Sequence, residues 1–444
     1  MKKLCVLSVI ILIVASFALS ACDSAEQEQE PHNGEDMHYN NGYNNDYISD
    51  EAGEDAPNFA GQEQVLQAAP ASLNLTRECF LHDFDYLMTM LEENAPYFSL
   101  IYRRNGVDML ALIPELRARL EDESQDINLA SFFNLIQNEF FYHALPVTHL
   151  WFESYLELRH RGMLNDAENI DGILRYRQRL GPVQRGGGGA GFLQGISTSV
   201  IEEGRIAYIS IPAFDNTPTP QQIQLIDDFY SQIEDFEHLI IDLRGNPGGW
   251  THFFDELIIA PLLMNPLQAR FHNFFQGGSH NLQFFEGFGV EPWRFQQVND
   301  DFLRRMFWDG LSQAVVDDLA IMDYSFHEVW TVHADPARRI NFNGRIWMLT
   351  DGYMASGAHM VAAFYCYVGF TTLVGETTGG MYVSRNIGSN IIQLPRTGLF
   401  LRYDMTYVLD ANGRAVDYGI DPHYFNLPGM DALETVLELI RRGN

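Results

Sequence analysis

Lysine is almost absent from this sequence. Only Lys2 and Lys3 occur among its 444 residues, and both lie in an N-terminal segment that is typical of a cleaved export signal. Without that segment the mature chain has no amine side chain. Every mechanism that needs a lysine as general base or nucleophile is therefore excluded, and a catalytic base has to be another residue.

Cysteine is scarce as well, with four residues in the chain. Beyond Cys22, the part that remains after signal removal contains only Cys79 and Cys366. Cys366 lies in an apolar helical run, which favours a buried, unreactive thiol over a disulfide partner or a nucleophile. No CxxC or HExxH spacing occurs, so we expect no metal site and no cofactor.

Residues 1–21 have the features of a signal peptide. Two lysines precede an apolar stretch of about 16 residues, which is shorter than the ~20 residues that span a bilayer. The stretch ends in Leu19-Ser20-Ala21-Cys22, which resembles a bacterial lipobox. We therefore expect Cys22 to become a lipid-modified N-terminus that anchors the protein on the extracytoplasmic face of a cell membrane. A short transmembrane anchor is the alternative.

The composition of residues 22–73 predicts an acidic, disordered tether. Between Asp23 and Pro57 there are eleven carboxylates and no lysine or arginine, and few branched apolar residues are available for burial. Removing these eleven negative charges and the two signal lysines changes the formal charge from −31 to −22. The remaining body therefore still repels polyanions, and nucleic acid is not an expected partner.

The rest of the chain is long enough for two domains. Residues 74–165 form a predicted small helical domain, because apolar residues recur at three- and four-residue steps from Phe80 to Leu91. Residues 166–203 contain a glycine run and read as a connector. Residues 204–444 are a predicted α/β core, interrupted by an aromatic-rich insertion at 264–341. The insertion is either a satellite hydrophobic core or a lid over a site.

The core alternates strands and helices, which is the pattern of an α/β fold. Predicted strands cover residues 205–211, 238–243, 345–349, 371–374, 390–394 and 399–403, and predicted helices cover 221–234, 250–263, the segment after Ser356, and 431–442. Before the core, Pro146 ends a helix and residues 147–152 read as a further strand.

Ser356 occupies a position that suits a nucleophile. It follows a predicted strand and a glycine-containing turn, and it opens an apolar helix whose N-terminal amides favour developing negative charge. A serine that merely caps the helix has the same sequence signature. Asn246-Pro247-Gly248-Gly249 follows another buried strand, and its glycines present unobstructed amides that suit an oxyanion site. A plain turn is the simpler alternative.

Four segments in order, HLIIDLRGNPGG, WMLTDGYMASGAHM, TTLVGETTGG and VDYGIDPHY, resemble the tail-specific (C-terminal processing) serine peptidases and their tricorn and interphotoreceptor-retinoid-binding-protein relatives. The resemblance covers residues 204–426 and, more weakly, His149. It implies a crotonase-like core of repeated ββα units. It also implies Ser356 as nucleophile, with the amides of Gly248 or Gly249 and of Gly357 as oxyanion donors.

The base differs from that of the serine-lysine branch of the family. Gly380-Met381 stand where that branch has its lysine, and His359 replaces a glutamate. The tricorn-like branch recruits a histidine from the preceding domain, and Thr148-His149 fits that pattern. A late carboxylate orients this histidine in the branch, and the resemblance points to Asp417. His359 is the rival base, because it lies one turn after Ser356 on the same helix face.

The sequence thus predicts a lipid-anchored serine peptidase with a histidine base that acts on proteins or peptides. No segment between His149 and residue 204 is long enough for the peptide-binding PDZ module of many family members. The alternative is a catalytically inactive member of the family that binds an apolar ligand or a peptide through the aromatic insertion. Loss of the family's lysine and glutamate favours this alternative, and retention of Ser356 with its glycine loop favours the enzyme.

Overall fold

The computed structural model describes residues 75–153 and 195–443, except residues 216, 288–289, 291, 308–309 and 386. The predicted signal peptide, Cys22, the tether and most of the connector lie outside these residues. Within the described ranges, no helix combines the length and apolarity that crossing a membrane requires.

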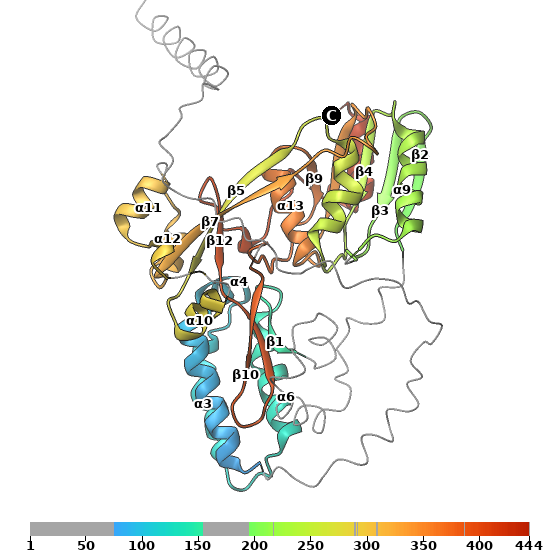
Figure 1. The fold of residues 1–444 in the computed structure, drawn as a ribbon. Helices are drawn as coiled ribbons and strands as arrows, with labels where there is room; N and C mark the ends of the chain where they lie inside the picture. The colour runs from blue at the N-terminus through green and yellow to red at the C-terminus, as the bar shows by residue number, and fades with distance from the viewer. Residues whose placement is uncertain are drawn as a thin grey trace, which may run out of the picture. The chain divides into compact units, whose positions relative to one another are not determined.

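The N-terminal part is helical, as the apolar periodicity predicts (Figure 1). It consists of α3 (Arg77–Asn94), α4 (Phe98–Asn105), α5 (Met109–Glu121) and α6 (Leu129–Glu139). The start of α6 is fixed by a capping box, in which the Asn128 side chain accepts the Ser131 amide and the Ser131 hydroxyl accepts the Asn128 amide. A 3-10 turn, η2 (Phe141–Ala144), then leads to strand β1 (Leu150–Glu153).

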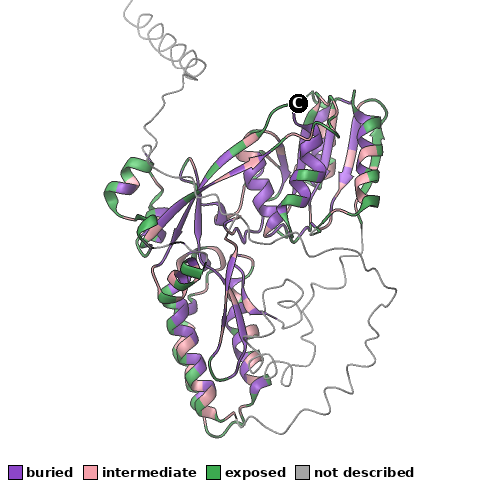
Figure 2. Ribbon diagram, viewed as in Figure 1, coloured by how far each residue is buried: buried purple, intermediate pink, exposed green. Residues whose placement is uncertain are grey.

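Strand β1 joins these helices to the C-terminal half of the chain. It pairs antiparallel with β11 (Phe400–Asp404), which also pairs with β10 (Ser389–Gln393). The buried apolar residues of the helices and of these strands form one hydrophobic cluster, and Figure 2 shows purple, buried residues along both. The helices therefore pack on the C-terminal strands. The Leu150↔Tyr403 register also brings the residues just before β1 close to the end of β11.

A six-stranded sheet forms the centre of the α/β core. Its order is β13-β9-β8-β4-β3-β2, and the strands from β3 to β13 run parallel. Strand β2 (Ser197–Glu202) is antiparallel to β3 and starts before residue 204, so the predicted connector ends in a strand. The other strands are β3 (Ile206–Ser210), β4 (His238–Asp242), β8 (Arg345–Thr350), β9 (Thr372–Gly375) and β13 (Tyr424–Phe425).

Helices cover both faces of this sheet, which explains its continuous apolar strands. Alternate residues of β4 face opposite sides: Leu239 and Ile241 belong to one cluster, and Ile240 belongs to the other. The first cluster includes α9 (Pro220–Ile233) and α13 (Gly357–Tyr367), and the second includes α14 (Ala432–Arg441). Burial of each fully buried aliphatic side chain of α14 stabilises the folded state by about 1.5–3 kcal/mol.

The helix predicted from residue 250 is a π-helix, η3 (Phe253–Ile259), followed by a short 3-10 turn, η4 (Ala260–Leu262). The pattern of apolar residues indicated a helix here, but it does not distinguish i+4 from i+5 hydrogen bonding. π-helices are rare and are often found at functional sites.

The aromatic insertion is built around a second antiparallel sheet of order β12-β5-β7-β6. Its strands are β5 (Leu267–Phe275), β6 (Gln296–Gln297), β7 (Tyr324–Val332) and the later β12 (Tyr407–Asp410). The helical segments are α10 (Ser279–Gly287), η5 (Pro292–Arg294), α11 (Asp300–Met306) and α12 (Gln313–Leu319). Most of its aromatic side chains are buried, and several belong to the neighbouring cores: Phe274 and Phe307 to the cluster of the N-terminal helices, and Phe271 and Trp330 to that of the α/β core. Trp293 is exposed, and Trp308 lies outside the described residues.

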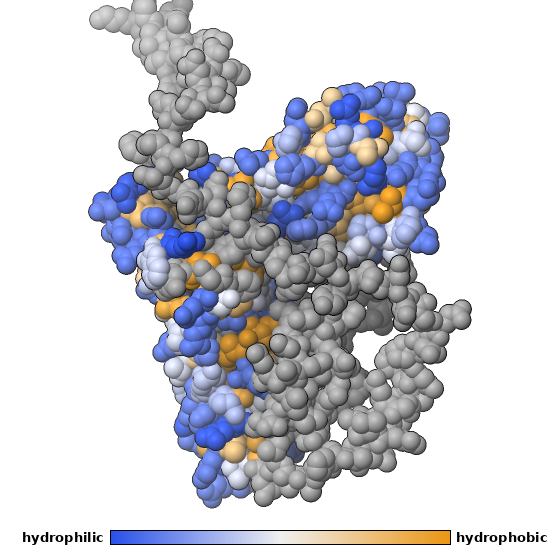
Figure 3. Space-filling view, in the orientation of Figure 1, coloured by the Kyte–Doolittle hydropathy of each residue, from blue (hydrophilic) through white to orange (hydrophobic). Residues whose placement is uncertain are grey.

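The visible surface of the described residues is largely hydrophilic, with scattered apolar residues (Figure 3). Isolated exposed apolar side chains of this kind are normal for folded proteins.

Candidate active site

Two turns meet at the C-terminal edge of the parallel sheet. One follows β4 and contains Asn246, and the other follows β8 and leads to Ser356. Because β4 and β8 are adjacent and parallel, their C-terminal turns lie side by side. Two hydrogen bonds join them: the Gly245 amide donates to Asp351 Oδ2 (2.9 Å) and the Ala355 amide donates to the Asn246 carbonyl (3.2 Å).

Ser356 adopts an unusual backbone conformation, with φ of 51° and ψ of −128°. Positive φ is uncommon for residues other than glycine. The conformation is fixed by its surroundings, since the Ser356 amide donates to the Gly380 carbonyl (2.9 Å). A Cβ on Gly248 would lie only 2.8 Å from the Ser356 Cβ, so only glycine fits there. The Ser356 side chain makes no capping hydrogen bond to α13, which rules out the simple cap interpretation.

The imidazole of His149 contacts the Ser356 hydroxyl. Its Nε2 lies 3.1 Å from Ser356 Oγ, although 207 residues separate the two in the chain. Its Nδ1 lies 2.8 Å from Asp404 Oδ2. The His149 residue is only 4% exposed. A nucleophile, a base within hydrogen-bond distance and a carboxylate that orients the base are the arrangement of a catalytic triad.

The Asp404 carboxylate is held by four donors. Oδ2 accepts from the Thr148 hydroxyl (2.9 Å), from the His149 amide (2.7 Å) and from His149 Nδ1, and Oδ1 accepts from the Ser389 hydroxyl (2.5 Å). Burial alone would raise the pKa of Asp404. The contact with His149, the charge of Arg402 and the Ser389 hydrogen bond together bring it below its ordinary value, which favours the ionised form.

Asp417, which the family resemblance pointed to as the orienting carboxylate, lies elsewhere. It is fully buried in the turn η6 (Val416–Tyr418), where its Oδ1 accepts the Tyr382 amide (3.1 Å). Its Oδ2 has no hydrogen-bond partner among the described residues. Burial, and secondarily the negative charge of Asp404, raise the pKa of Asp417 well above its ordinary value. The structure therefore corrects the prediction: Asp404, and not Asp417, is hydrogen-bonded to His149, and the Thr148 hydroxyl donates to Asp404.

The sequence held only a weak signal for Asp404. It directly follows the apolar run at 399–403, which predicted a strand, but the pairing of that strand with β1 is a long-range feature. The motif that resembles the family's late carboxylate lies 13 residues further along the chain, at Asp417, and sequence spacing alone favoured it.

His359, the rival base, is also fully buried. Its Nδ1 lies 2.8 Å from the Thr378 hydroxyl, and its Nε2 has no partner within the described part of the chain. Burial, and then the charge of Arg104, lower the pKa of His359 to about 3. The imidazole is therefore neutral at ordinary pH, and its contacts are with the core, whereas Ser356 Oγ is contacted by His149.

Two glycine amides remain available beside Ser356. The Gly248 amide is occupied, because it donates to Asn246 Oδ1 (2.8 Å), which removes one of the predicted oxyanion donors. The amides of Gly249 and Gly357 have no acceptor among the described residues. These two glycines are in close contact, since a Cβ on Gly357 would lie 3.2 Å from the Gly249 nitrogen. The amides of Gly249 and Gly357 are therefore the candidate oxyanion donors beside Ser356.

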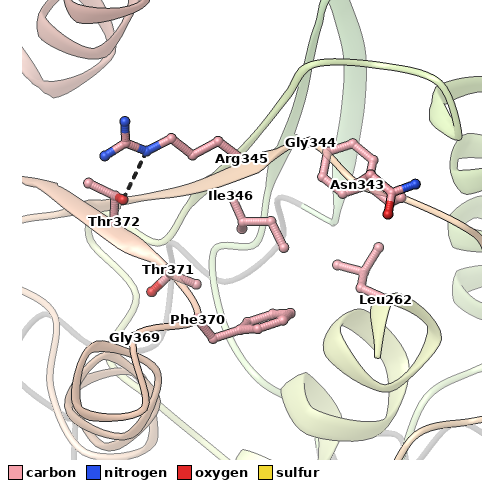
Figure 4. Close-up of a pocket in the computed structure, with 10 residues that line it drawn as sticks. Leu262, Asn343, Gly344, Arg345, Ile346, Gly369, Phe370, Thr371 and Thr372 are labelled. Atoms are coloured by element: carbon pink, nitrogen blue, oxygen red, sulfur yellow. Dashed lines mark hydrogen bonds between the residues drawn. The ribbon is translucent and has the colours of Figure 1, made fainter. Parts of the chain in front are cut away.

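A pocket of about 340 Å³ lies at the opposite edge of the sheet (Figure 4). It is lined by Arg345 and Ile346 at the start of β8 and by Phe370 and Thr372 near the start of β9. Ser356 follows the other end of β8, so this pocket is separate from the triad. Among the described residues, no group of three His, Cys, Asp or Glu side chains is arranged to hold a metal ion.

Comparisons with known proteins find a peptidase family and a similar fold. Residues 205–425 match the model of peptidase family S41. Mature CPAF complexed with lactacystin has a similar fold, with a TM-score of 0.50 and 13% identity over 82% of this chain and 97% of that chain. A lipoprotein from Streptococcus agalactiae (TM-score 0.40, 14% identity, 84% and 98% coverage) and the photosystem II D1 C-terminal processing protease (0.38, 11%, 80% and 94%) are more distant. A search of curated protein sequences gives no match.

Proposed function

We propose that this chain is a serine peptidase that uses a histidine as base in place of lysine. The match of residues 205–425 to the model of peptidase family S41 supports the proposal. The observation that carries the proposal is the hydrogen-bonded series from Ser356 Oγ through the His149 imidazole to Asp404. The substrate class is proteins or peptides.

The first half of the reaction forms an acyl-enzyme. His149 Nδ1–H donates to Asp404, so the ring is held as the tautomer whose Nε2 accepts the Ser356 proton. Ser356 Oγ attacks the scissile carbonyl carbon as Nε2 takes that proton. The imidazolium is stabilised by ionised Asp404 and then protonates the leaving amine. Asp404 keeps its negative charge throughout, because Thr148 and Ser389 also donate to it.

The oxyanion of the tetrahedral intermediate faces the amides of Gly249 and Gly357. These amides are fixed before the substrate binds, because the Gly248 carbonyl accepts the Phe214 amide and the Ser356 amide is bound to Gly380. In the second half, water attacks the acyl carbon with His149 again acting as base. Hydrolysis then releases the acyl product and regenerates the Ser356 hydroxyl.

Labelling with a fluorophosphonate tests the proposal, because only a serine that is activated beside an oxyanion site reacts quickly with such a probe. The wild-type protein should be labelled on Ser356 and should hydrolyse peptides, and Ser356→Ala should do neither. Ser325→Ala is a matched control, since Ser325 is a buried serine of β7 that lies outside the proposed catalytic residues. Absence of labelling and of hydrolysis by the wild type between pH 6 and 9 would make a binding protein the better account.

The location is a separate part of the proposal. The Leu19-Ser20-Ala21-Cys22 sequence supports lipidation of Cys22 and attachment to the extracytoplasmic face of a membrane. The wild-type protein should fractionate with membranes and carry a diacylated N-terminal cysteine, whereas Cys22→Ala should be soluble or unprocessed. A wild-type protein that is wholly soluble and unlipidated would contradict this.

A further inference from the structure

A buried carboxylate outside the triad links the elements that carry the catalytic groups. Asp255 is 2% exposed and lies in η3, the π-helix that begins four residues after Gly249. Its Oδ1 accepts the Tyr365 hydroxyl (2.6 Å), and its Oδ2 accepts Trp330 Nε1 (2.9 Å) and Arg385 Nη2 (2.9 Å). These three donors come from α13, from β7 and from the segment that follows Gly380.

The Arg385 guanidinium extends this link to the residues beside the oxyanion turn. Its Nε donates to the Thr251 hydroxyl (3.2 Å), its Nη2 lies 3.2 Å from His252 Nδ1, and it stacks over the Trp330 ring at 4.8 Å. Thr251 and His252 are the second and third residues after Gly249. The segment of Arg385 is itself fixed, since the Arg385 amide and the Ser384 hydroxyl both donate to Glu328.

Apart from β7, each linked element starts at or next to a proposed catalytic group. Helix α13 begins directly after Ser356, the turn before η3 contains Gly249, and the Arg385 segment begins at Gly380, whose carbonyl accepts the Ser356 amide. Resting on the proposed function, we infer that Asp255 is a positioning residue, which through Arg385 and Tyr365 holds the oxyanion turn at a fixed distance from Ser356.

The free-energy cost of burying Asp255 and Arg385 together indicates that this pair positions other groups and does not serve mainly to stabilise the fold. Taking a carboxylate and a guanidinium out of water often costs as much as their attraction returns. Burial raises the pKa of Asp255 to about 6, against the opposing effects of Arg385, Tyr365 and Trp330, and the charge of Glu256 raises it further. Burial and Arg385 keep His252 neutral by lowering its pKa to about 4.

Because the pKa of Asp255 is raised, acid should affect the stability of the fold and the rate of the reaction differently. Because the folded pKa of Asp255 is above its unfolded value, protonation of this group between pH 6 and about 4 favours the folded state. The same protonation removes the charge that holds Arg385. Acid therefore weakens the Asp255–Arg385 contact, but protonation of Asp255 does not unfold the protein. If Asp255 served stability alone, its protonation would not lower the reaction rate.

The test compares Asp255→Asn with Glu256→Gln, which removes a neighbouring exposed carboxylate from the same π-helix. Asp255→Asn should lower kcat and the fluorophosphonate labelling rate by about 10- to 100-fold, because small misplacements of catalytic groups have effects of this size. KM should change less than about threefold, and Glu256→Gln should match the wild type. Arg385→Gln, which leaves Asp255 in place, should also lower kcat.

The pH profile gives a second readout. Asp255 has to be ionised to hold Arg385, so the ratio of the wild-type labelling rate to that of Asp255→Asn should decrease as pH falls below about 6. Wild-type kcat in the folded Asp255→Asn variant, together with a rate ratio that does not change with pH, would overturn the inference.

Amide hydrogen exchange separates this inference from the proposed function. Residues 245–252 should exchange faster in Asp255→Asn than in the wild type or in Glu256→Gln. If the wild type has no activity, the proposed peptidase falls, but exchange still decides whether Asp255 positions the turn. Equal exchange in all three proteins would overturn the positioning role.

Discussion

Two histidine and aspartate sets lie near the start of α13, and they differ in what surrounds them. His149 and Asp404 are bonded to each other and to Ser356, with Thr148 and Ser389 completing the carboxylate's hydrogen bonds. His359 and Asp417 are just as buried, but each has one polar atom without a partner among the described residues.

The comparison teaches that neighbouring charges and hydrogen bonds, and not burial alone, decide the charge state here. Asp404 and Asp417 are 1% and 0% exposed, yet the pKa of Asp404 is below its ordinary value and that of Asp417 is well above it. Asp404 accepts four donors, whereas Asp417 accepts backbone amides on one side and faces the negative charge of Asp404. Only the first set offers an ionised carboxylate to a histidine.

The largest expected difference is between the two histidines. His149→Ala should lower peptide hydrolysis by about 10²–10⁴, the usual effect of losing a general base. His359→Ala should lower kcat by less than about tenfold, although it removes a fully buried side chain and should destabilise the fold. Rates are compared below the melting temperature of each variant. A larger loss for His359→Ala would reverse the assignment of the base.

Substitution of Thr148 and of Thr378 should give a smaller difference in kcat than substitution of the two histidines. Thr148→Val removes a donor to ionised Asp404, and hydrogen bonds to charged groups are worth about 1.5–3 kcal/mol, so kcat should fall by about 10- to 100-fold. Thr378→Val removes the partner of His359 and should lower the melting temperature while kcat stays within about threefold. Equal kcat losses in the two variants would mean that the Thr148 bond has no special role in the reaction.

A third difference concerns stability against acid and not the reaction rate. The folded pKa of His359 is about 3, below its ordinary value of 6.5, so between these values only the unfolded chain takes up a proton at this residue. Stability contributed by neutral His359 is therefore lost as pH falls, by up to about 1.4 kcal/mol per pH unit. Denaturant unfolding of His359→Gln between pH 6.5 and 4 should show a correspondingly smaller decrease than the wild type. Parallel decreases would contradict the burial of a neutral imidazole.

Sequence patterns predicted most of the fold and part of the site. Apolar periodicity and glycine turns are local signals, and they predicted the parallel strands and most helices of the core to within a few residues, but not the strands of the insertion. The contact of His149 with Ser356 came from the family resemblance, since no local signal links residues 207 positions apart. Asp404 was missed because β1 pairs with β11 through long-range register. The occupied Gly248 amide depends on one rotamer of Asn246, which no sequence pattern specifies.

The central claim is that Asp404, and not Asp417, supports the base of Ser356, and fluorophosphonate labelling of two variants tests it most directly. Asp404→Asn keeps the shape but removes the charge and favours the wrong His149 tautomer, so labelling should slow by about 10²–10⁴. Asp417→Asn replaces a carboxyl that burial already favours as neutral, so labelling should stay within about threefold of the wild type. Slow labelling of Asp417→Asn together with rapid labelling of Asp404→Asn would contradict the account.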